Sequence, residues 1–226
     1  MERIETMYVT AIITAGGLGS RMGSALPKQF IDVKGKPILA YSLLTFENCP
    51  RINEIILTSP AGYEEITRGT AEKYKISKVT KVITGGDTRQ QSVYYALQAE
   101  DGGGVVIIHD AARPFVTEDE ILRVIDTAEI SGAGAVGVPV TDTIKICDEN
   151  GFAVQTLPRD TLWQVQTPQA FLSHIIKEAH KRARENGICV SDDTELADRI
   201  GRPTRIIMGN YANIKITTKE DLSLFK

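Results

Sequence analysis

A glycine-rich segment, Ala15–Gly23, follows an apolar run near the start of the chain. Glycine lets backbone amides approach a polyphosphate closely, and successive N–H groups then form a concave site for an anion. Arg21 and Lys28 add fixed positive charge beside it. The segment predicts a phosphate-binding loop, although a tight turn alone would also use these glycines. The residues that would supply the amides are Gly16, Gly17 and Gly19.

Two better-known glycine motifs do not fit this segment. A Walker loop ends in Gly-Lys-Ser/Thr, and a dinucleotide-binding fingerprint has a third glycine where this chain has Met22. A basic stretch that contains proline follows, from Arg21 to Phe30, and helical periodicity resumes only near Ile38. We therefore expect an extended basic loop that wraps a triphosphate.

A second group of polar residues stands at the end of a buried apolar run, in Val105–Phe115. In a doubly wound sheet, ligands bind outside the carboxyl ends of the strands, which puts His109, Asp110 and Arg113 where chemistry is expected. A carboxylate beside a phosphate site can hold sugar hydroxyls or the water around a metal ion, so we favour a function for Asp110. For His109 we favour a hydrogen-bonded place in the core.

A third polar segment, Gly85–Ser92, follows another predicted strand and leads into a helix. Its glycines, the Asp87 carboxylate and the Ser92 hydroxyl could read the edge of a base, whose donors and acceptors need partners of fixed geometry. A helix cap would explain Asp87 and Ser92 equally well. On these residues alone both interpretations stay open.

The elements that must position these segments alternate along the chain. Short apolar runs rich in β-branched residues alternate with stretches of helical period, a pattern typical of a mainly parallel sheet with helices on both faces. One helix should begin at the capping box of Thr117 and Glu120. We predict an α/β protein with a Rossmann-like, doubly wound sheet whose strands include Val9–Ala15, Ile55–Ser59, Val79–Ile83, Val105–His109 and Ala135–Val140.

The pattern changes between residues 141 and 161. Two short β-like pieces, Thr143–Cys147 and Phe152–Leu157, flank a turn at Asp148–Gly151, which predicts a hairpin arm that stands out from the main sheet. No repeat, charge block or linker marks a domain boundary, so we expect a single domain over residues 1–226. This length is common for one α/β domain.

The composition excludes several classes of function. With 42% hydrophobic and 24% charged residues the chain has a globular balance, and a net charge of -3 argues against nucleic acid as a partner. No apolar run approaches the ~20 residues of a membrane span, and the first residues lack the layout of a signal peptide. The three cysteines are far apart and lack metal-binding spacing. We therefore expect a cytoplasmic protein without a membrane partner.

Taken together, these segments resemble the methylerythritol-phosphate cytidylyltransferases of non-mevalonate isoprenoid synthesis, from about Met7 to Phe225. The resemblance is carried by AGGxGxRM followed by PKQ, GGDxRxxS, HDAARPF, PVTDT, LWQVQTPQAF and NIKIT, in this order. It implies a fold of the nucleotide-diphospho-sugar transferase type and transfer of CMP from CTP to 2-C-methyl-D-erythritol 4-phosphate, with release of pyrophosphate. It also implies Mg²⁺ held mainly by the CTP phosphates, and a homodimer whose hairpin arms clasp each other.

The resemblance further assigns roles to single residues. Arg21 and Lys28 would stabilise charge on the CTP phosphates in the transition state, and the ionised acceptor phosphate would attack without a protein nucleophile or general base. The cytosine and ribose contacts would fall on Ala15, Gly16, Gly86, Asp87 and Ser92. The acceptor would be positioned by Asp110, Lys215, Thr143 and Arg159, and we add Arg113 because it follows the same strand as Asp110. Arg159 and Thr143 would come from the arm of a second copy.

Three other functions compete with this one. A ribitol-phosphate or other polyol-phosphate cytidylyltransferase is the nearest, because a phosphate-binding Arg and Lys do not specify the carbon skeleton of the acceptor. A nicotinamide dehydrogenase would need the missing third glycine and an acidic residue after the second strand, where Leu57–Pro60 has none. A nucleotide-binding module without activity would not need both Arg21 and Lys28 at one phosphate loop.

Overall fold

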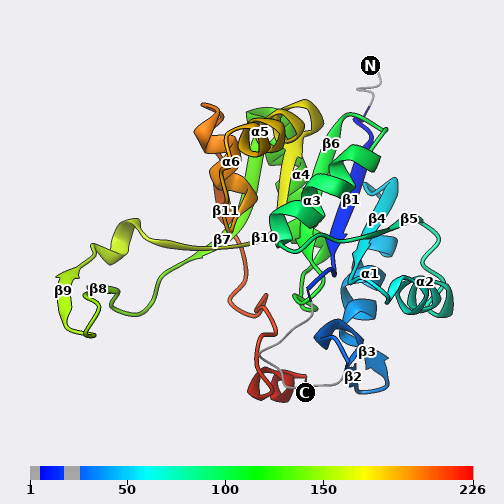
Figure 1. Ribbon diagram of the computed structural model, residues 1–226, viewed down its shortest axis with the longest axis horizontal. Helices are drawn as coiled ribbons and strands as arrows, with labels where there is room; N and C mark the ends of the chain where they lie inside the picture. Colours follow the sequence, from blue (N-terminus) through cyan, green and yellow to red (C-terminus); the bar gives the residue numbers. More distant parts are fainter. Residues whose placement is uncertain (1–5, 18–25, 226) are drawn as a thin grey trace.

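The apolar runs of the sequence form a central sheet that is buried on both faces. The computed structural model describes residues 6–17 and 26–225, and within them seven strands pair in the order β11-β7-β10-β6-β1-β4-β5 (Figure 1). Pairing is parallel except for β10, which confirms the predicted mainly parallel sheet. The strands are β1 (Val9–Thr14), β4 (Glu54–Ser59), β5 (Val79–Thr84), β6 (Val105–Asp110), β7 (Ala133–Pro139), β10 (Trp163–Leu172) and β11 (Arg205–Met208).

Helices cover both faces of this sheet, because its strands carry apolar side chains on both sides. On one face, Ala11 and Ile13 of β1 pack with side chains of α1, α2 and α4, whereas on the other face Ile12 packs with α3, α5 and α6. The predicted capping box of Thr117 and Glu120 does begin α4. Within the described residues, no helix is long and apolar enough to span a membrane. The helices are α1 (Ile38–Asn48), α2 (Glu64–Lys73), α3 (Arg89–Ala99), α4 (Glu118–Ser131), α5 (Ser173–Glu185) and α6 (Asp193–Arg199).

Strand β10 is the main element that the sequence pattern did not predict. It inserts between β6 and β7 and runs antiparallel to both. Its sequence contains Pro168 and polar residues on both sides of it, which is unusual for a central strand. The ladder with β7 shifts register between Val165 and Gln169, so the proline lies where the regular pairing is interrupted.

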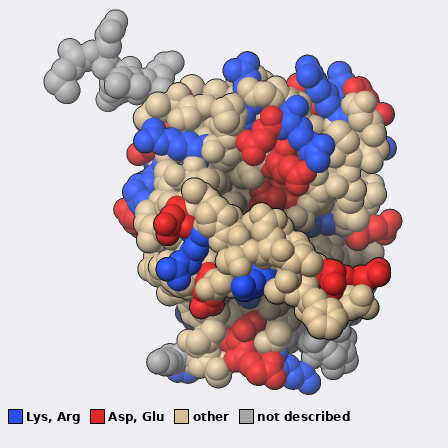
Figure 2. Space-filling model, turned by 90° about the vertical axis from the view of Figure 1, so that its left-hand side faces the viewer, with Lys and Arg blue, Asp and Glu red and all other residues tan. Residues whose placement is uncertain are grey.

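The predicted hairpin arm is present and extends away from the sheet (Figure 1). Its strands are β8 (Lys145–Cys147) and β9 (Ala153–Thr156), and the Asp148 carboxylate accepts hydrogen bonds from the backbone of Asn150 and Phe152 at the turn. Large apolar side chains are exposed on it, including Phe152 at 71% and Val154 at 63%. Figure 2 shows that the face on the arm's side is formed largely by uncharged side chains, with acidic ones gathered above.

Candidate functional site

The polar segments singled out in the sequence meet at one edge of the sheet, where the parallel strands end. Thr14, Ser59, Thr84 and Asp110 are the last residues of β1, β4, β5 and β6. The chain moves from β1 to β4 and β5 on one side and to β6 on the other, and sheets of this type bind ligands at such a switch point. The loops enclose a cavity of about 540 Å³ here, called the first cavity.

Most of the predicted site residues that the structure describes line the first cavity. They come from the glycine-rich segment, the basic loop after it, the loop that follows β5, the end of β6 and the C-terminal segment. These residues are Ala15, Gly16, Gly17, Lys28, Gly86, Asp87, Ser92, Asp110 and Lys215. Gly19 and Arg21 lie outside the described residues, so their roles stay predictions.

The glycine-rich segment is held against the loop after β5 by close backbone contact. A Cβ atom on Gly16 would come within 2.9 Å of the Ser92 hydroxyl oxygen, and one on Gly85 would come within 3.2 Å of the Gly16 Cα. The Gln29 side-chain amide donates to the carbonyls of Ala15 at 2.5 Å and of Gly17 at 3.1 Å. The two loops therefore pack only because both lack side chains at the contact.

Ser92 stands at the wall of the first cavity with its proton already in use. Its hydroxyl donates to the Thr88 carbonyl and accepts from the backbone N–H of Gly86, and both donor–acceptor distances are 3.0 Å. The cap of α3 is Thr88, whose side chain accepts from the N–H of Gln91, so the alternative interpretation of Asp87 and Ser92 as helix caps is wrong. A ligand would meet Ser92 as a hydrogen-bond acceptor.

Asp110 is a buried carboxylate that is shared by two cations. Its Oδ1 atom accepts from Arg89 Nε at 2.8 Å, and its Oδ2 atom accepts from Lys215 Nζ at 2.6 Å. Burial by itself raises the pKa of this carboxyl, but the charges of Arg89 and Lys215 outweigh it and hold the pKa well below its usual range. Asp110 is therefore ionised and orients the two cations at the cavity wall.

Arg89 is a site residue that sequence reasoning missed. Its guanidinium bridges Asp110 and Asp193, with Nη1 lying 2.5 Å from Asp193 Oδ2. Asp193 in turn lies 2.9 Å from Nε2 of His180, on α5. The signal was available in principle, because a buried carboxylate such as Asp110 needs a cation, and Arg89 stands inside the polar segment Gly85–Ser92.

His109 occupies the hydrogen-bonded place in the core that the sequence predicted. It is fully buried, and its Nε2 atom lies 3.1 Å from the Arg113 carbonyl, to which only an N–H can bond. Its Nδ1 atom therefore accepts from the Thr167 hydroxyl, also at 3.1 Å. Burial lowers the pKa of His109 to about 3, so the ring is neutral and takes no part in acid–base chemistry near neutral pH.

A second cavity, of about 420 Å³, adjoins the first. Arg89, Asp110 and Lys215 line both cavities. Arg113 lines only the second, where its guanidinium donates to the Asn213 carbonyl at 2.7 Å. Thr167 of β10 also lines the second cavity. The shared wall means that molecules bound in the two cavities would meet at Asp110 and Lys215.

Two predicted site residues lie far from these cavities within the same chain. Thr143 and Arg159 belong to the segment of the arm and line neither cavity, and the Arg159 guanidinium donates to the Thr141 carbonyl at 2.8 Å. One chain by itself therefore does not bring them to the site, as expected if a second copy supplies them.

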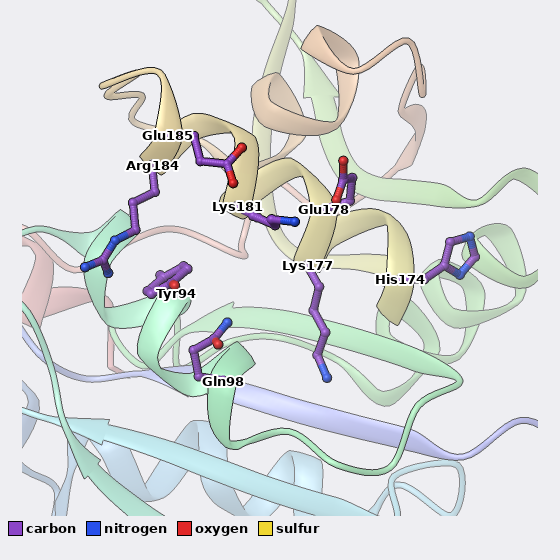
Figure 3. A pocket seen from close by; sticks show the side chains of 8 residues that line it. All are labelled: Tyr94, Gln98, His174, Lys177, Glu178, Lys181, Arg184 and Glu185. Atoms are coloured by element: carbon purple, nitrogen blue, oxygen red, sulfur yellow. The ribbon is translucent and has the colours of Figure 1, made fainter.

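A larger and more open hollow, of about 720 Å³, lies between α3 and α5 (Figure 3). Arg184 stacks over the ring of Tyr94 at 4.8 Å, and Lys177 pairs with Glu100 at 2.7 Å. The side chains that Figure 3 labels around the hollow are mostly charged and come from the exposed sides of the two helices. The described parts of the polar segments singled out in the sequence do not line it, so we assign the chemistry to the first and second cavities.

Known proteins resemble this chain over nearly its whole length. Residues 9–226 match the family described as IspD: 2-C-methyl-D-erythritol 4-phosphate cytidylyltransferase. A curated protein of that name from Caldanaerobacter subterraneus is 43% identical over 218 residues, 96% of each chain. Another, from Clostridium botulinum, is 45% identical over 216 residues, 95% of this chain and 94% of that one. The crystal structure of 4-diphosphocytidyl-2C-methyl-D-erythritol synthase from Anaerococcus prevotii has a TM-score of 0.86 at 33% identity and covers 97% of this chain and 95% of its own.

Proposed function

Because this chain belongs to the 2-C-methyl-D-erythritol 4-phosphate cytidylyltransferase family, we propose that the first cavity binds CTP and the second cavity binds the acceptor. The enzyme transfers CMP from CTP to 2-C-methyl-D-erythritol 4-phosphate and releases pyrophosphate, in the non-mevalonate route to isoprenoid precursors. One observation carries the assignment of cavities: Asp110 and Lys215 line both, so the two substrates would meet there. The family match favours this acceptor over ribitol phosphate.

The wall of the first cavity suits the base and the phosphates of CTP. Gly86, Asp87 and Ser92 would surround the cytosine. Because the Ser92 hydroxyl donates its proton to the Thr88 carbonyl, its oxygen would accept a hydrogen bond from the amino group of the base. Uracil has a carbonyl at that position and would repel the same oxygen. Ala15, Gly16 and Gly17 would face the ribose and phosphates with backbone groups.

The reaction needs stabilisation of charge rather than a protein nucleophile. An oxygen of the acceptor phosphate attacks the α-phosphorus of CTP in line, a P–O bond forms, and the bond to the departing pyrophosphate breaks. Negative charge spreads over the phosphate oxygens as this happens. The Lys28 ammonium, which donates to the Ile216 carbonyl at 2.7 Å, lines the cavity and can neutralise that charge, and we propose the same role for Arg21.

The side chains at this site are compatible with a magnesium ion whose main ligands would be the phosphates of CTP. Among the described residues that line the first cavity, the carboxylates are Asp87 and Asp110, and both Asp110 oxygens already bind cations. Mg²⁺ usually keeps several waters and binds substrate phosphates. We therefore propose that CTP oxygens and water hold it, where it would neutralise charge on the triphosphate.

We propose that each acceptor site is completed by the arm of a second copy. In its own chain the arm carries Thr143 and Arg159 away from both cavities and exposes Phe152 and Val154. Contiguous patches of exposed apolar side chains mark surfaces that bind other proteins, and Phe152 and Val154 stand two residues apart on the arm. A homodimer that clasps through the arms would cover them and add a phosphate-binding arginine to the second cavity.

The shared site can be tested by mixing two inactive variants. A dimer of one Arg159→Ala chain and one Lys28→Ala chain contains one intact site, because the intact Lys28 and the intact Arg159 meet in it. Mixing should therefore restore activity that neither variant has, while mixing two Lys28→Ala preparations should restore none. If the heterodimer forms but has no activity, the shared site is excluded.

We also place the enzyme in the cytoplasm. Cys49, Cys147 and Cys189 are all free thiols in the structure. Disulfides are rare in reducing compartments, so unpaired cysteines support this placement.

The activity itself is tested by magnesium-dependent release of pyrophosphate from CTP. We expect release with 2-C-methyl-D-erythritol 4-phosphate, far less with ribitol 5-phosphate, and little when UTP replaces CTP. Preference for ribitol 5-phosphate would overturn the acceptor, and equal use of UTP would overturn the role of the Ser92 oxygen. Reaction without added magnesium after chelation would exclude the proposed ion.

A further inference from the structure

A chain of hydrogen-bonded polar side chains, formed by one histidine and four charged residues, runs from the buried side of α5 to the wall shared by the two cavities. His180 Nε2 lies 2.9 Å from Asp193 Oδ1, and Asp193 Oδ2 lies 2.5 Å from Arg89 Nη1. Arg89 Nε then lies 2.8 Å from Asp110 Oδ1, and Asp110 Oδ2 lies 2.6 Å from Lys215 Nζ. We call these five residues the buried charge chain. Its inner members, His180 and Asp193, have side chains that are only 1% exposed.

The outer end of the buried charge chain must be able to change partners. Lys215 lines the second cavity, where it would turn to the phosphate of the acceptor while Asp110 stays buried. A buried carboxylate that loses its only cation is strongly destabilised. Because Arg89 also neutralises Asp110, the Lys215 ammonium can share its hydrogen bonds with a ligand without leaving an unpaired charge behind.

The Arg89 guanidinium directs two of its nitrogens, Nε and Nη1, at buried carboxylates. Although its side chain lines both cavities, its Nη2 atom is shielded from solvent and has no hydrogen-bond partner among the described residues. A ligand that enters the cavities does not reach that atom in this arrangement. What fixes the guanidinium is its bond to Asp193, which is itself held by His180.

We propose that Arg89 and Asp193 are positioning residues for the acceptor: they fix the Asp110 carboxylate and, through it, aim the Lys215 ammonium at the acceptor phosphate. The proposal rests on the assignment of the second cavity to the acceptor. Asp193 lines neither cavity, so any effect of its substitution on the acceptor must pass through Arg89. Because the Lys215 ammonium is assigned to the acceptor phosphate, we expect the KM for the acceptor to rise much more than the KM for CTP, although Arg89 and Asp110 also line the first cavity.

The test compares Asp193→Asn, Arg89→Gln and the double variant in steady-state kinetics with each substrate varied. Asp193→Asn keeps the size of the side chain and removes the charge that holds Arg89. Because a misplacement of about 1 Å can cost ~100-fold, we expect the KM for the acceptor to rise about 10-fold or more while the KM for CTP changes less than about 2-fold. The double variant should have the same KM for the acceptor as Arg89→Gln alone, since Asp193 acts only through Arg89.

A matched control is available at the opposite end of α3. Glu100 is also a fully buried carboxylate paired with a lysine, 2.7 Å from Lys177, and it lines neither cavity. Glu100→Gln should lower the melting temperature without moving the KM for the acceptor. If Asp193→Asn does not fold, Arg89→Lys replaces it, because a lysine keeps the charge but does not bridge two carboxylates with one planar group. It should then raise the KM for the acceptor selectively.

The proposal would be overturned by equal rises in the KM values of both substrates, by additive effects on the acceptor KM in the double variant, or by the same rise in the acceptor KM of Glu100→Gln. An acceptor KM like that of the wild type in both Asp193→Asn and Arg89→Lys would also overturn it. Failure of the proposed function has a different signature, because the wild-type enzyme would then show no turnover of CTP that depends on 2-C-methyl-D-erythritol 4-phosphate.

Discussion

Gly16 and Gly17 are neighbours in the glycine-rich segment, yet alanine should affect the melting temperature differently at the two positions. A Cβ atom on Gly16 would lie 2.9 Å from the Ser92 hydroxyl oxygen, 3.5 Å from the Gly85 Cα and 3.5 Å from the Thr58 hydroxyl oxygen. The first of these distances forces a shift, and overpacking of this kind typically costs about 1–3 kcal/mol. For a chain of this size, 1 kcal/mol moves the melting temperature by roughly 2–4 °C, so Gly16→Ala should lower it by about 2–12 °C.

Among the described residues, none lies within 4 Å of where a Cβ atom on Gly17 would stand, and the position lies on the first cavity. Gly17→Ala should therefore keep the melting temperature or raise it slightly, because alanine has fewer unfolded conformations to lose. The added methyl group would instead keep the CTP phosphates from approaching the backbone, and the KM for CTP should rise.

Thermal unfolding and steady-state kinetics of the two variants separate these effects. Gly16→Ala should lose stability and bind CTP less well, because Ser92 is displaced with the loop. A wild-type melting temperature for Gly16→Ala would refute the close contact of the two loops, and so would a decrease in the melting temperature of Gly17→Ala as large as that of Gly16→Ala. A wild-type KM for CTP in Gly17→Ala would refute backbone contact with the phosphates at that residue.

Three further predictions concern single side chains. Lys28→Ala should lower kcat by about 100- to 1,000-fold, as the loss of one charge-stabilising group does, and should leave the far-UV circular dichroism spectrum unchanged. A smaller loss of kcat would contradict the role of Lys28 in stabilising the transition state. Ser92→Ala should reduce the preference for CTP over UTP by about 2- to 10-fold, the value of one hydrogen bond, and an unchanged preference would contradict its contact with the base. The pKa of His109 is lowered by burial to about 3, below the unfolded value near 6.5, so the unfolded state binds the extra proton between these values. The free energy of unfolding should then fall as pH decreases from 6.5 toward 3, by at most about 1.4 kcal/mol per pH unit, and denaturant titrations of His109→Gln should lack this part of the slope.

The sequence predicted those parts of the fold that short-range patterns determine. β1 and β6 are continuous apolar runs, and the capping box of α4 is local, so each could be recognised from a few neighbouring residues. β10 could not, because its pairing with two strands distant in the chain overrides a sequence interrupted by Pro168. Its existence depends on contacts that no local period encodes.

The same distinction applies to the site. Gly16, Gly86 and Asp110 each follow a predicted strand at the edge where such sheets bind ligands, and the structure shows that all three line the first cavity. Arg89 was missed because its partners, Asp110 and Asp193, are 21 and 104 residues away along the chain. The buried carboxylate of Asp110 indicates that some cation must pair with it, but which arginine or lysine does so depends on the segments that the fold brings together.

The arm is mechanically continuous with the middle of the sheet. The segment that returns from it enters β10 at Trp163, and β10 pairs with both β6 and β7. Four residues further along, the hydroxyl of Thr167 accepts from the backbone N–H of Asp110, at 3.0 Å. A displacement of the arm would thus be transmitted along β10 to Thr167 and, through this hydrogen bond, to the backbone of Asp110, so the arm and the site are mechanically coupled.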